Sequence, residues 1–599
     1  MGETSTAAKS TEGIPGLAPK RIIICCDGSG QSAVSGDESV PSNVTRLCRA
    51  INPVGYDKGD IHQERPWQQV VWYDSGIGTN SAGQVPVGKD LEGNIIEAYN
   101  FCVLNWSEGD QIMCFGFSRG AYTARAIAGL ISDLGICKRA DLQDFPEVWK
   151  LYKQSRPALT GEQFYGSDAY FDYHHGKPAD PQPIKHMAPN DKIAWEYAGR
   201  GEWAVSPKSR QVEVVGVFET VGALGFPEVF GYEMPHWMSD KPEWHNVGLS
   251  PNIKNAFQAL ALDEHRAAFT PTLFYVPPVE KATLEDIELQ EKKFKDADRA
   301  WSNIVSDNDK KRPTIENMKK ALKRKNAAER GLLKLYDSQK ERTNLLQVWF
   351  PGVHINIGGG SDLTLENKGN MEEMSSITFA WMLDQIKDYV SLNAATLEED
   401  KDDHLKRLSA ANDTLACYLK DVEKRKKESW TQWAMRGPQR VVSSLLYPLS
   451  LLTPAPKPKA DYMNEPAFTW GLGDLPDNFS LKYYVNGSRA RKPGCYAYDK
   501  HGKELGKTFE EIHPVVNYRV QNAKYHPIGL KGEDYKRLPK QGGGGYEYWF
   551  KYPGAKEYQV LAESKISDKE GSYEVEAMEG DDTAVKYASD QLNILIKTL

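Results

Sequence analysis

Residues 111–125, QIMCFGFSRGAYTAR, decide the fold of this chain. The apolar run at residues 112–115 is typical of a buried strand, and the small and apolar residues from Ala121 onward are spaced as in a helix. Between them stands the pentapeptide GFSRG, residues 116–120, which has the pattern Gly-x-Ser-x-Gly. A strand, this pattern and a helix together predict a nucleophile elbow, a tight turn that lifts the serine hydroxyl above the end of a sheet.

The elbow gives its residues candidate roles. Ser118 is the candidate nucleophile, and the two flanking glycines fit a turn that has no room for side chains. The backbone N–H of Arg119, the residue after the serine, is directed at the place where the oxygen of an attacked carbonyl becomes an oxyanion. The alternative is an ordinary serine in a strand-to-helix turn.

The composition bounds the class of protein. The 599 residues are too many for one core, and 40% hydrophobic with 26% charged residues is typical of a soluble globular protein. A net charge of -8 gives no reason to expect nucleic-acid binding. Residues 1–19 lack the apolar part of a signal peptide, and the eight cysteines show no metal-binding spacing. We therefore expect reduced thiols and an intracellular, cytoplasmic protein.

Two glycine patterns look like nucleotide sites but lack residues that such sites need. Residues 28–30, Gly-Ser-Gly, follow a strand-like run, yet a polar stretch stands where the helix should begin, and Asp27 would repel a phosphate. Residues 83–89 look like a phosphate-binding loop, but Asp90 stands where Ser or Thr would bind Mg²⁺. We therefore expect no cofactor and no metal.

Apolar runs predict the other strands of the sheet. We expect strands at residues 21–26, 69–73, 212–218, 271–276 and 345–350.

Two candidate partners for the serine follow these strands. Glu219 directly follows the run at 212–218, and His354 stands on a loop after a late strand. Open α/β sheets place functional groups at the carboxyl ends of their strands. Ser118, Glu219 and His354 also occur in the order serine, acid, histidine that is typical of α/β hydrolases. Glu219 is thus the candidate acid and His354 the candidate general base, with a solvated carboxylate and a structural histidine as the alternatives.

Changes in composition divide the chain into regions. Residues 279–343 are highly charged and helical in pattern, which predicts a helical insertion. In the last part of the chain, residues 513–520, HPVVNYRV, are β-like, and no catalytic constellation stands out. We expect a disordered tail at 1–19, an α/β-hydrolase domain at 20–395, a charged helix with an apolar segment and a Pro-rich linker at 396–460, and a C-terminal α+β region at 461–599.

The apolar segment at residues 441–453, VVSSLLYPLSLLT, allows two interpretations. It is too short to span a bilayer, which needs roughly 20 residues. Basic residues at 424–427 precede it, so it fits an interfacial anchor or lid that gives peripheral membrane association. The alternative is a segment packed on the hydrolase core.

Six blocks of sequence carry a resemblance to a known family. In chain order they are RIIICCDGSG, YDSGIGT, GFSRGAYTARAIAGLI, GVFETVGALG, ALALDEHRAAFTPTLF and QVWFPGVHINIGGG. Together they closely resemble an uncharacterised, mostly fungal α/β-hydrolase domain family. That family is similar to the catalytic domain of bacterial type VI secretion phospholipase effectors. The resemblance covers roughly residues 20–390, and the block EEIHPVVNYRV extends it toward the C-terminus.

The resemblance implies an α/β-hydrolase fold with Ser118 as the nucleophile. The chain departs from the family at two positions, because Glu219 and Asn356 stand where the family usually has Asp. Glu can serve as the acid of a catalytic triad. Asp263 is a fallback acid, and Asp362 is a weaker one.

These observations predict a serine hydrolase that cleaves a carboxylic ester. By analogy with the bacterial effectors, we expect this ester to belong to a lipid or a phospholipid. His354 would take the proton of Ser118, and an N–H of Gly28 or Ser29 would join that of Arg119 in binding the oxyanion. The alternative is a catalytically impaired hydrolase-fold protein that binds a lipid or a protein partner. The two changed acidic positions motivate this alternative.

Overall fold

The structure is a computed structural model, and most of the chain is described in it. The described residues are 18–28, 30–34, 39–57, 66–76, 87–159, 163–178, 195–198, 200–221, 247–276, 281–306, 315–362, 365, 370–409, 470–476, 488–498, 504–540, 546–552, 555–567, 571–579 and 581–596. Ser29 and the segment 441–453 lie outside these ranges. Among the described residues, no helix combines the length and the apolar character that crossing a membrane requires.

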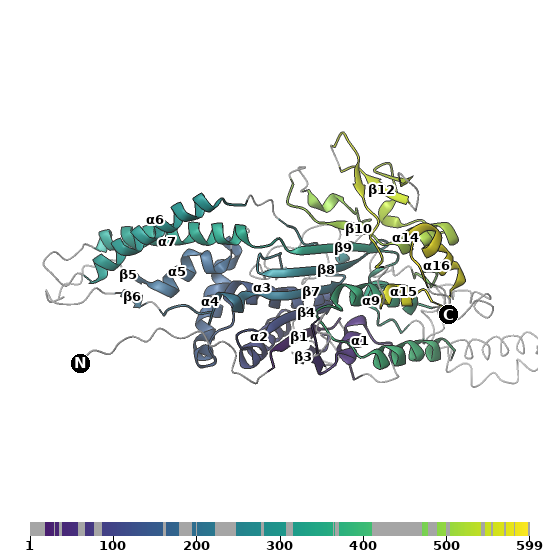
Figure 1. Ribbon diagram of the computed structural model, residues 1–599, viewed down its shortest axis with the longest axis horizontal. Coiled ribbons are helices and arrows are strands. Elements are labelled where there is room, and N and C mark those ends of the chain that lie inside the picture. The colour runs from purple at the N-terminus through teal and green to yellow at the C-terminus, as the bar shows by residue number, and fades with distance from the viewer. Residues whose placement is uncertain are drawn as a thin grey trace, which may run out of the picture.

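The centre of the molecule is a mostly parallel sheet of eight strands in the order β10-β9-β8-β7-β4-β1-β3-β2 (Figure 1). Every neighbouring pair is parallel except β2 and β3. This places the chain in the α/β class. The strands are β1 (Lys20–Cys26), β2 (Val54–Gly55), β3 (Trp67–Asp74), β4 (Gln111–Phe117), β7 (Val212–Phe218), β8 (Ile253–Ala261), β9 (Asn344–Phe350) and β10 (Glu510–Ile512).

Helices cover both faces of the sheet (Figure 1). Alternate residues of β1 belong to different cores, with Ile22 and Ile24 in one and Ile23 and Cys25 in the other. The first core includes residues of α2 and α3, and the second includes residues of α1 and α9. These helices are α1 (Asn43–Ala50), α2 (Val87–Asn105), α3 (Arg119–Leu134) and α9 (Glu372–Ile386).

Smaller elements lie beside this framework. A further helix occupies residues 394–409. The other small elements before the C-terminal region are α4 (Phe145–Ser155), α5 (Asp168–His175), β5 (Gly176–Pro178), β6 (Trp195–Ala198) and the short α8 (His354–Gly358).

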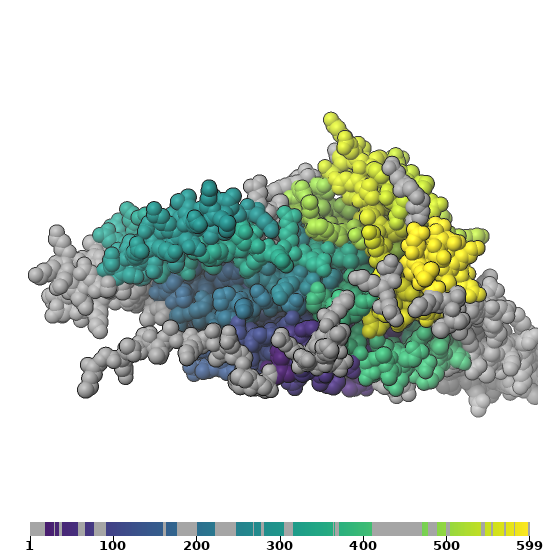
Figure 2. All heavy atoms as spheres, viewed as in Figure 1, coloured from purple at the N-terminus to yellow at the C-terminus, as the bar shows by residue number. Residues whose placement is uncertain are grey.

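The charged insertion is a pair of long helices, as its sequence pattern predicts. Helices α6 (Leu284–Ser306) and α7 (Ile315–Gln339) lie side by side and extend away from the sheet (Figure 1). In the space-filling view the pair lies at one end of the visible face, and the C-terminal region bulges from the other (Figure 2). Trp301, Met318 and Leu322 form a small core between the two helices.

The C-terminal region is continuous with the main sheet. Its strand β10 (Glu510–Ile512) pairs with β9, so residues more than 150 positions beyond β9 complete the edge of that sheet. The other C-terminal elements are α14 (Pro514–Asn522), β11 (Tyr535–Pro539), β12 (Tyr546–Phe550), β13 (Gln559–Leu561), α15 (Tyr573–Glu576) and α16 (Asp582–Tyr587).

The strand expected at residues 271–276 is wrong. Only isolated bridges occur there, at Pro271 and Val276. The strand of the sheet that the sequence did not predict is β8. In place of a strand ladder, side chains form hydrogen bonds with the backbone N–H and carbonyl groups of this segment. Arg125 donates to the carbonyls of Thr272 and Leu273, and the side chain of Gln347 bonds both the N–H and the carbonyl of Phe274.

The β-like interpretation of residues 513–520 is also wrong, because most of this segment belongs to α14. The side chain of His513 caps the helix by accepting a hydrogen bond from Val515 N, and Pro514 occupies the first helical position. Residues 514–519 are all buried. A helix buried on all sides has no polar face, so its sequence does not show the helical period.

Candidate active site

Ser118 lies in the turn between β4 and α3. Its backbone has a conformation that residues other than glycine rarely adopt. Its φ is 58° and its ψ is −121°. A Cβ on Gly116 would lie 2.5 Å from the carbonyl oxygen of Gly120, and a Cβ on Gly120 would lie 2.3 Å from that of Asp27. Neither flanking position therefore accepts a side chain, and the strained turn is retained because the sheet and helix around it fix it.

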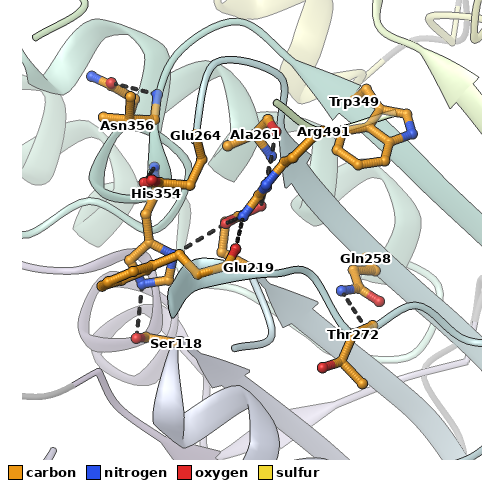
Figure 3. A network of polar contacts seen from close by, with 12 residues as sticks. Ser118, Glu219, Gln258, Ala261, Glu264, Thr272, Trp349, His354, Asn356 and Arg491 are labelled. Carbon is orange, nitrogen blue, oxygen red and sulfur yellow. Dashed lines mark hydrogen bonds and ion pairs between the residues drawn. The ribbon is translucent and has the colours of Figure 1, made fainter. Parts of the chain in front are cut away.

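His354 is the first residue of the short helix α8, which follows β9, and not part of a loop as the sequence predicts; its side chain reaches Ser118 from there. Its Nε2 lies 2.8 Å from Ser118 Oγ (Figure 3). The imidazole stacks on Phe117, with 5.0 Å between ring centroids, and meets the edge of Phe269 at the same centroid distance. These two aromatic rings fix the plane of the imidazole and place apolar surface beside the hydrogen bond to Ser118.

Glu219 contacts the other nitrogen of the imidazole. It follows β7 with a φ of 49°, and its Oε2 lies 3.1 Å from His354 Nδ1 (Figure 3). The carboxylate is buried, and Ala261 N donates to its Oε1 at 2.6 Å. A carboxylate that accepts from Nδ1 leaves Nε2 of a neutral imidazole as the acceptor that faces the serine.

Arg491 binds both oxygens of Glu219. Its Nη1 lies 2.6 Å from Oε1 and its Nη2 2.8 Å from Oε2, and the guanidinium is buried. It also donates to the carbonyls of Ala261 and Phe269, each at 2.8 Å. Burial raises the pKa of the Glu219 carboxyl, but the charge of Arg491 and the hydrogen bonds from His354 and Arg491 outweigh burial and lower that pKa to about 2.

Glu264 supports the N-terminus of α8, where His354 stands. Its Oε2 accepts a hydrogen bond from His354 N at 3.2 Å, and the carboxylate is paired with Arg266 at 2.6 Å. Burial raises the pKa of the Glu264 carboxyl, but Arg266 outweighs burial and the net shift is downward. Neither Glu264 nor Arg491 was predicted from the sequence, since no local pattern links them to partners 90 and 272 positions away, respectively.

The fallback acids make other contacts. Asp263 accepts hydrogen bonds from Gly352 N and the Tyr525 hydroxyl, both at 2.7 Å, and from Ile528 N at 2.8 Å. Asp362 accepts from Val40 N at 2.9 Å. Of the candidate acids, Glu219 is the one hydrogen-bonded to the His354 side chain.

Asn356 stabilises the turn around His354. Its Oδ1 accepts a hydrogen bond from Val353 N at 3.1 Å, and its Nδ2 donates to the carbonyl of Asp474 at 3.5 Å. The residue is fully buried. The amide thus acts on the backbone before His354 rather than on the imidazole (Figure 3).

The oxyanion candidates differ in position. Arg119 is the first residue of α3, where the helix dipole favours negative charge. The N–H of Gly28 is directed at the side chain of Asp27, at 2.7 Å, and Ser29 lies outside the described residues. The Asp27 carboxylate also accepts from the hydroxyls of Ser42, Thr45 and Tyr73, so it organises the first loop of the sheet.

A comparison with known families gives one match over most of the chain. The profile of the family described as "T6SS, Phospholipase effector Tle1-like, catalytic domain" matches residues 20–385. This range contains Ser118, Glu219 and His354, but Arg491 lies beyond it.

Comparisons with individual proteins give shorter or weaker likenesses. An uncharacterised protein of Saccharomyces cerevisiae is 26% identical over 153 residues, which cover 22% of this chain and 20% of the yeast protein. A crystal structure of an uncharacterised protein from Pseudomonas aeruginosa is 14% identical, with a TM-score of 0.27, and the match covers 62% of this chain and 46% of that one. The matches thus span about a fifth of the yeast protein and less than half of the Pseudomonas chain.

Proposed function

Because the chain belongs to the family of type VI secretion phospholipase effector Tle1-like catalytic domains, we propose that it is a serine hydrolase that cleaves a carboxylic ester of a lipid. Membership of this family implies a hydrolase of the phospholipase or esterase type. The finer proposal is an α/β-hydrolase fold with Ser118 as nucleophile. The observation that carries it is the hydrogen-bonded series Ser118 Oγ, His354 Nε2, His354 Nδ1 and Glu219 Oε2.

The first half of the reaction forms an acyl-enzyme. Ser118 Oγ attacks the ester carbonyl while His354 Nε2 takes the hydroxyl proton. Glu219 accepts a hydrogen bond from Nδ1–H and stabilises the imidazolium that results. His354 then gives the proton to the alcohol oxygen that leaves, so the carbon–oxygen bond of the ester breaks and the acyl group stays on Ser118.

The second half repeats these roles with water. His354 takes a proton from a water molecule, whose oxygen attacks the acyl carbon. The proton returns to Ser118 Oγ as the acid is released. In both halves the N–H of Arg119 is the proposed donor to the oxyanion, and losing one such donor costs on the order of 10²–10³ in kcat.

Hydrolysis of a short and a long p-nitrophenyl ester and of a phospholipid panel tests the proposal, with Ser118→Ala as the variant. We expect kcat to fall by about 10⁶-fold, because the residues of a triad act as a unit. Ser107→Ala is a matched control, since the exposed Ser107 precedes β4 whereas Ser118 follows it. The control variant should keep the wild-type rates.

Labelling with a fluorophosphonate separates the enzyme from the non-catalytic alternative. Labelling that disappears in Ser118→Ala and persists in Ser107→Ala supports the hydrolase. Folded wild-type protein that neither takes up the probe nor cleaves any ester of the panel would contradict it. That outcome would favour a binding module on a hydrolase-like scaffold.

A further inference from the structure

The end of helix α5 faces the helical insertion. Helix α5 lies beside α7 of the α6–α7 pair (Figure 1). His174 and His175 are the last two residues of α5, and Glu329 belongs to α7. His175 Nε2 lies 3.0 Å from Glu329 Oε2. The three side chains each bring one possible ligand atom to within 4.8 Å of those of the other two. Two imidazoles and a carboxylate thus converge where the insertion meets α5.

Aromatic stacking holds the two imidazoles. The His174 ring stacks on Tyr170, with 6.3 Å between centroids and 11° between planes. The His175 ring stacks on Phe171, with 5.9 Å and 18°. Tyr170 and Phe171 are buried, and the centroids of the two imidazoles are 4.1 Å apart. Because packing already fixes the rings, a ligand that they bind together costs little further side-chain entropy.

One nitrogen of this group is left without a partner. His174 Nδ1 is buried and forms no hydrogen bond among the described residues. A buried polar atom that has lost its hydration without compensation indicates a partner that the protein itself does not supply. Neutral imidazole is the commonest metal ligand in proteins, so a metal ion is a partner that suits both histidines.

The charges around the group leave room for a cation. Arg330, which follows Glu329, is paired with Asp168 in α5. Glu202 lies close enough to His174 to interact with it electrostatically, and it is paired with Arg210. Each arginine therefore has an acid of its own. Two neutral imidazoles and the Glu329 carboxylate together carry one negative charge, which attracts a divalent cation.

We propose that His174, His175 and Glu329 bind a zinc ion that fixes the helical insertion to α5. Two nitrogen ligands and one carboxylate suit zinc, whereas Mg²⁺ and Ca²⁺ prefer oxygen ligands. Ligand atoms lie about 2.0–2.2 Å from zinc, so in a tetrahedron they are roughly 3.3 Å apart. The separation of His175 and Glu329 is close to this value, and gathering all three atoms takes side-chain movements of about 1.5 Å or less. A water molecule would take the fourth position.

The positions of the ligands explain why the sequence did not lead us to expect a metal. Two of them are consecutive, and the third follows His175 by 154 residues. Metal sites are recognised in a sequence by ligands that recur at short, regular spacings. A metal bridge between distant positions closes a long loop of the unfolded chain, so it stabilises the contact between α5 and α7.

Calorimetric titration of zinc into the whole, chelator-treated chain tests the site. We expect one zinc per wild-type chain and a Kd weaker by about 100-fold or more in Glu329→Gln, since a ligand matters at least as much as the groups that orient it. This substitution keeps a side chain that can hydrogen-bond His175, so folding is retained. Mg²⁺ should bind neither protein at this site. Folded wild type that binds no zinc, or an unchanged Kd in Glu329→Gln, would overturn the proposal.

Matched substitutions control for charge and for histidine content. Glu288→Gln changes an exposed acid of α6, and His526→Gln changes an exposed histidine of the C-terminal region. Both should bind zinc as wild type does, whereas His175→Gln should lose it as Glu329→Gln does. Equal weakening in Glu288→Gln and Glu329→Gln would show that zinc responds to net charge and not to this site.

Hydrogen exchange tests whether the zinc fixes the insertion. At a zinc concentration ten times Kd, we expect amides of α5 and α7 that exchange by opening of this contact to slow by about ten-fold. Amides of β4 should keep their rates, and Glu329→Gln should show no effect of zinc. Zinc that binds through the three residues without slowing exchange in α7 would overturn the structural role.

Discussion

Arg491 and Glu219 form a buried ion pair in which the guanidinium bonds both carboxylate oxygens, at 2.6 and 2.8 Å. Glu219 lies within the family match at residues 20–385, and Arg491 lies in the C-terminal region. The side chain that contacts the imidazole of His354 is therefore fixed by a cation from outside the matched domain. The two guanidinium nitrogens hold the Glu219 carboxylate in an orientation in which its Oε2 also contacts His354 Nδ1.

We expect Arg491→Gln to impair catalysis through the position of Glu219. Removal of the cation leaves a buried carboxylate without its partner, which costs about 3–5 kcal/mol of stability. Since Glu219 would no longer be held against His354, kcat should fall on the order of 10²-fold, less than the roughly 10⁴-fold cost of losing a tautomer-fixing acid. Steady-state kinetics with a p-nitrophenyl ester and urea denaturation measure the two effects.

Two further variants show whether Arg491 acts by its geometry. Arg491→Lys keeps the charge but loses the fork, so its kcat should lie between those of wild type and Arg491→Gln. Arg489→Gln is the control, since Arg489 is exposed and two residues away. Equal rates for Arg491→Gln and wild type, in folded protein, would contradict a role for this ion pair in catalysis.

Asn356→Asp introduces the acid that the sequence resemblance leads us to expect at this position. We expect kcat to stay within about three-fold of wild type, because the amide bonds Val353 N and not the imidazole. Stability should decrease by about 1–3 kcal/mol, since a second carboxylate oxygen would face the carbonyl of Asp474 in place of Nδ2. Kinetics and urea denaturation of the variant measure both. A ten-fold gain in kcat would show that a carboxylate here acts on His354.

Gly120→Ala tests the close packing of α3 against β1. A Cβ at this position would lie 2.3 Å from the carbonyl oxygens of Cys26 and Asp27. Both are backbone atoms, so they cannot move aside as the end of a flexible side chain could. We expect a loss of about 3 kcal/mol or more, together with loss of the serine's position. Gly93→Ala is the matched control in α2, where a Cβ meets nothing within 4 Å. It should stabilise the protein by about 0.5–1 kcal/mol. Thermal unfolding of both variants measures the contrast.

The parts of the site that the sequence predicted are those with local signals. Ser118 stands in a strand-to-helix turn whose glycines are required by contacts within a few residues or with the adjacent strand. Glu219 and His354 follow apolar runs, so their position at the carboxyl edge could be read from the strands. Arg491 has no such signal, because its role depends on how a distant segment packs over the ends of β7 and β8.

The strand β8 was missed because polar residues interrupt its sequence, IKNAFQALA. Asn255 and Gln258 are buried all the same, since the Asn255 amide donates to the carbonyl of Glu213 and that of Gln258 to the carbonyl of Thr272. Their hydrogen bonds replace the apolar contacts that mark a buried strand. Tertiary contacts of this kind cannot be deduced from a single run of residues.

We expect Glu373 to make the contact between α9 and the C-terminal region sensitive to pH. Its side chain is buried, accepts a hydrogen bond from Gly471 N at 3.3 Å, and leaves Oε2 without a partner among the described residues. Burial raises the pKa of this carboxyl to about 8, partly opposed by Gly471 N and reinforced by Asp581. A folded-state pKa above the unfolded value means that the folded protein binds the extra proton between about pH 4.5 and 8.

The stability of wild type should therefore fall as pH rises through this window, because unfolding releases that proton. Glu373→Gln keeps a neutral side chain at every pH, so its stability should vary less, and at pH 8.5 it should exceed that of wild type by about 2–4 kcal/mol. Urea denaturation at pH 5 and 8.5 measures the difference, with the exposed Glu398→Gln as control. Parallel pH profiles for wild type and Glu373→Gln would show that this carboxyl is ionised in the folded protein.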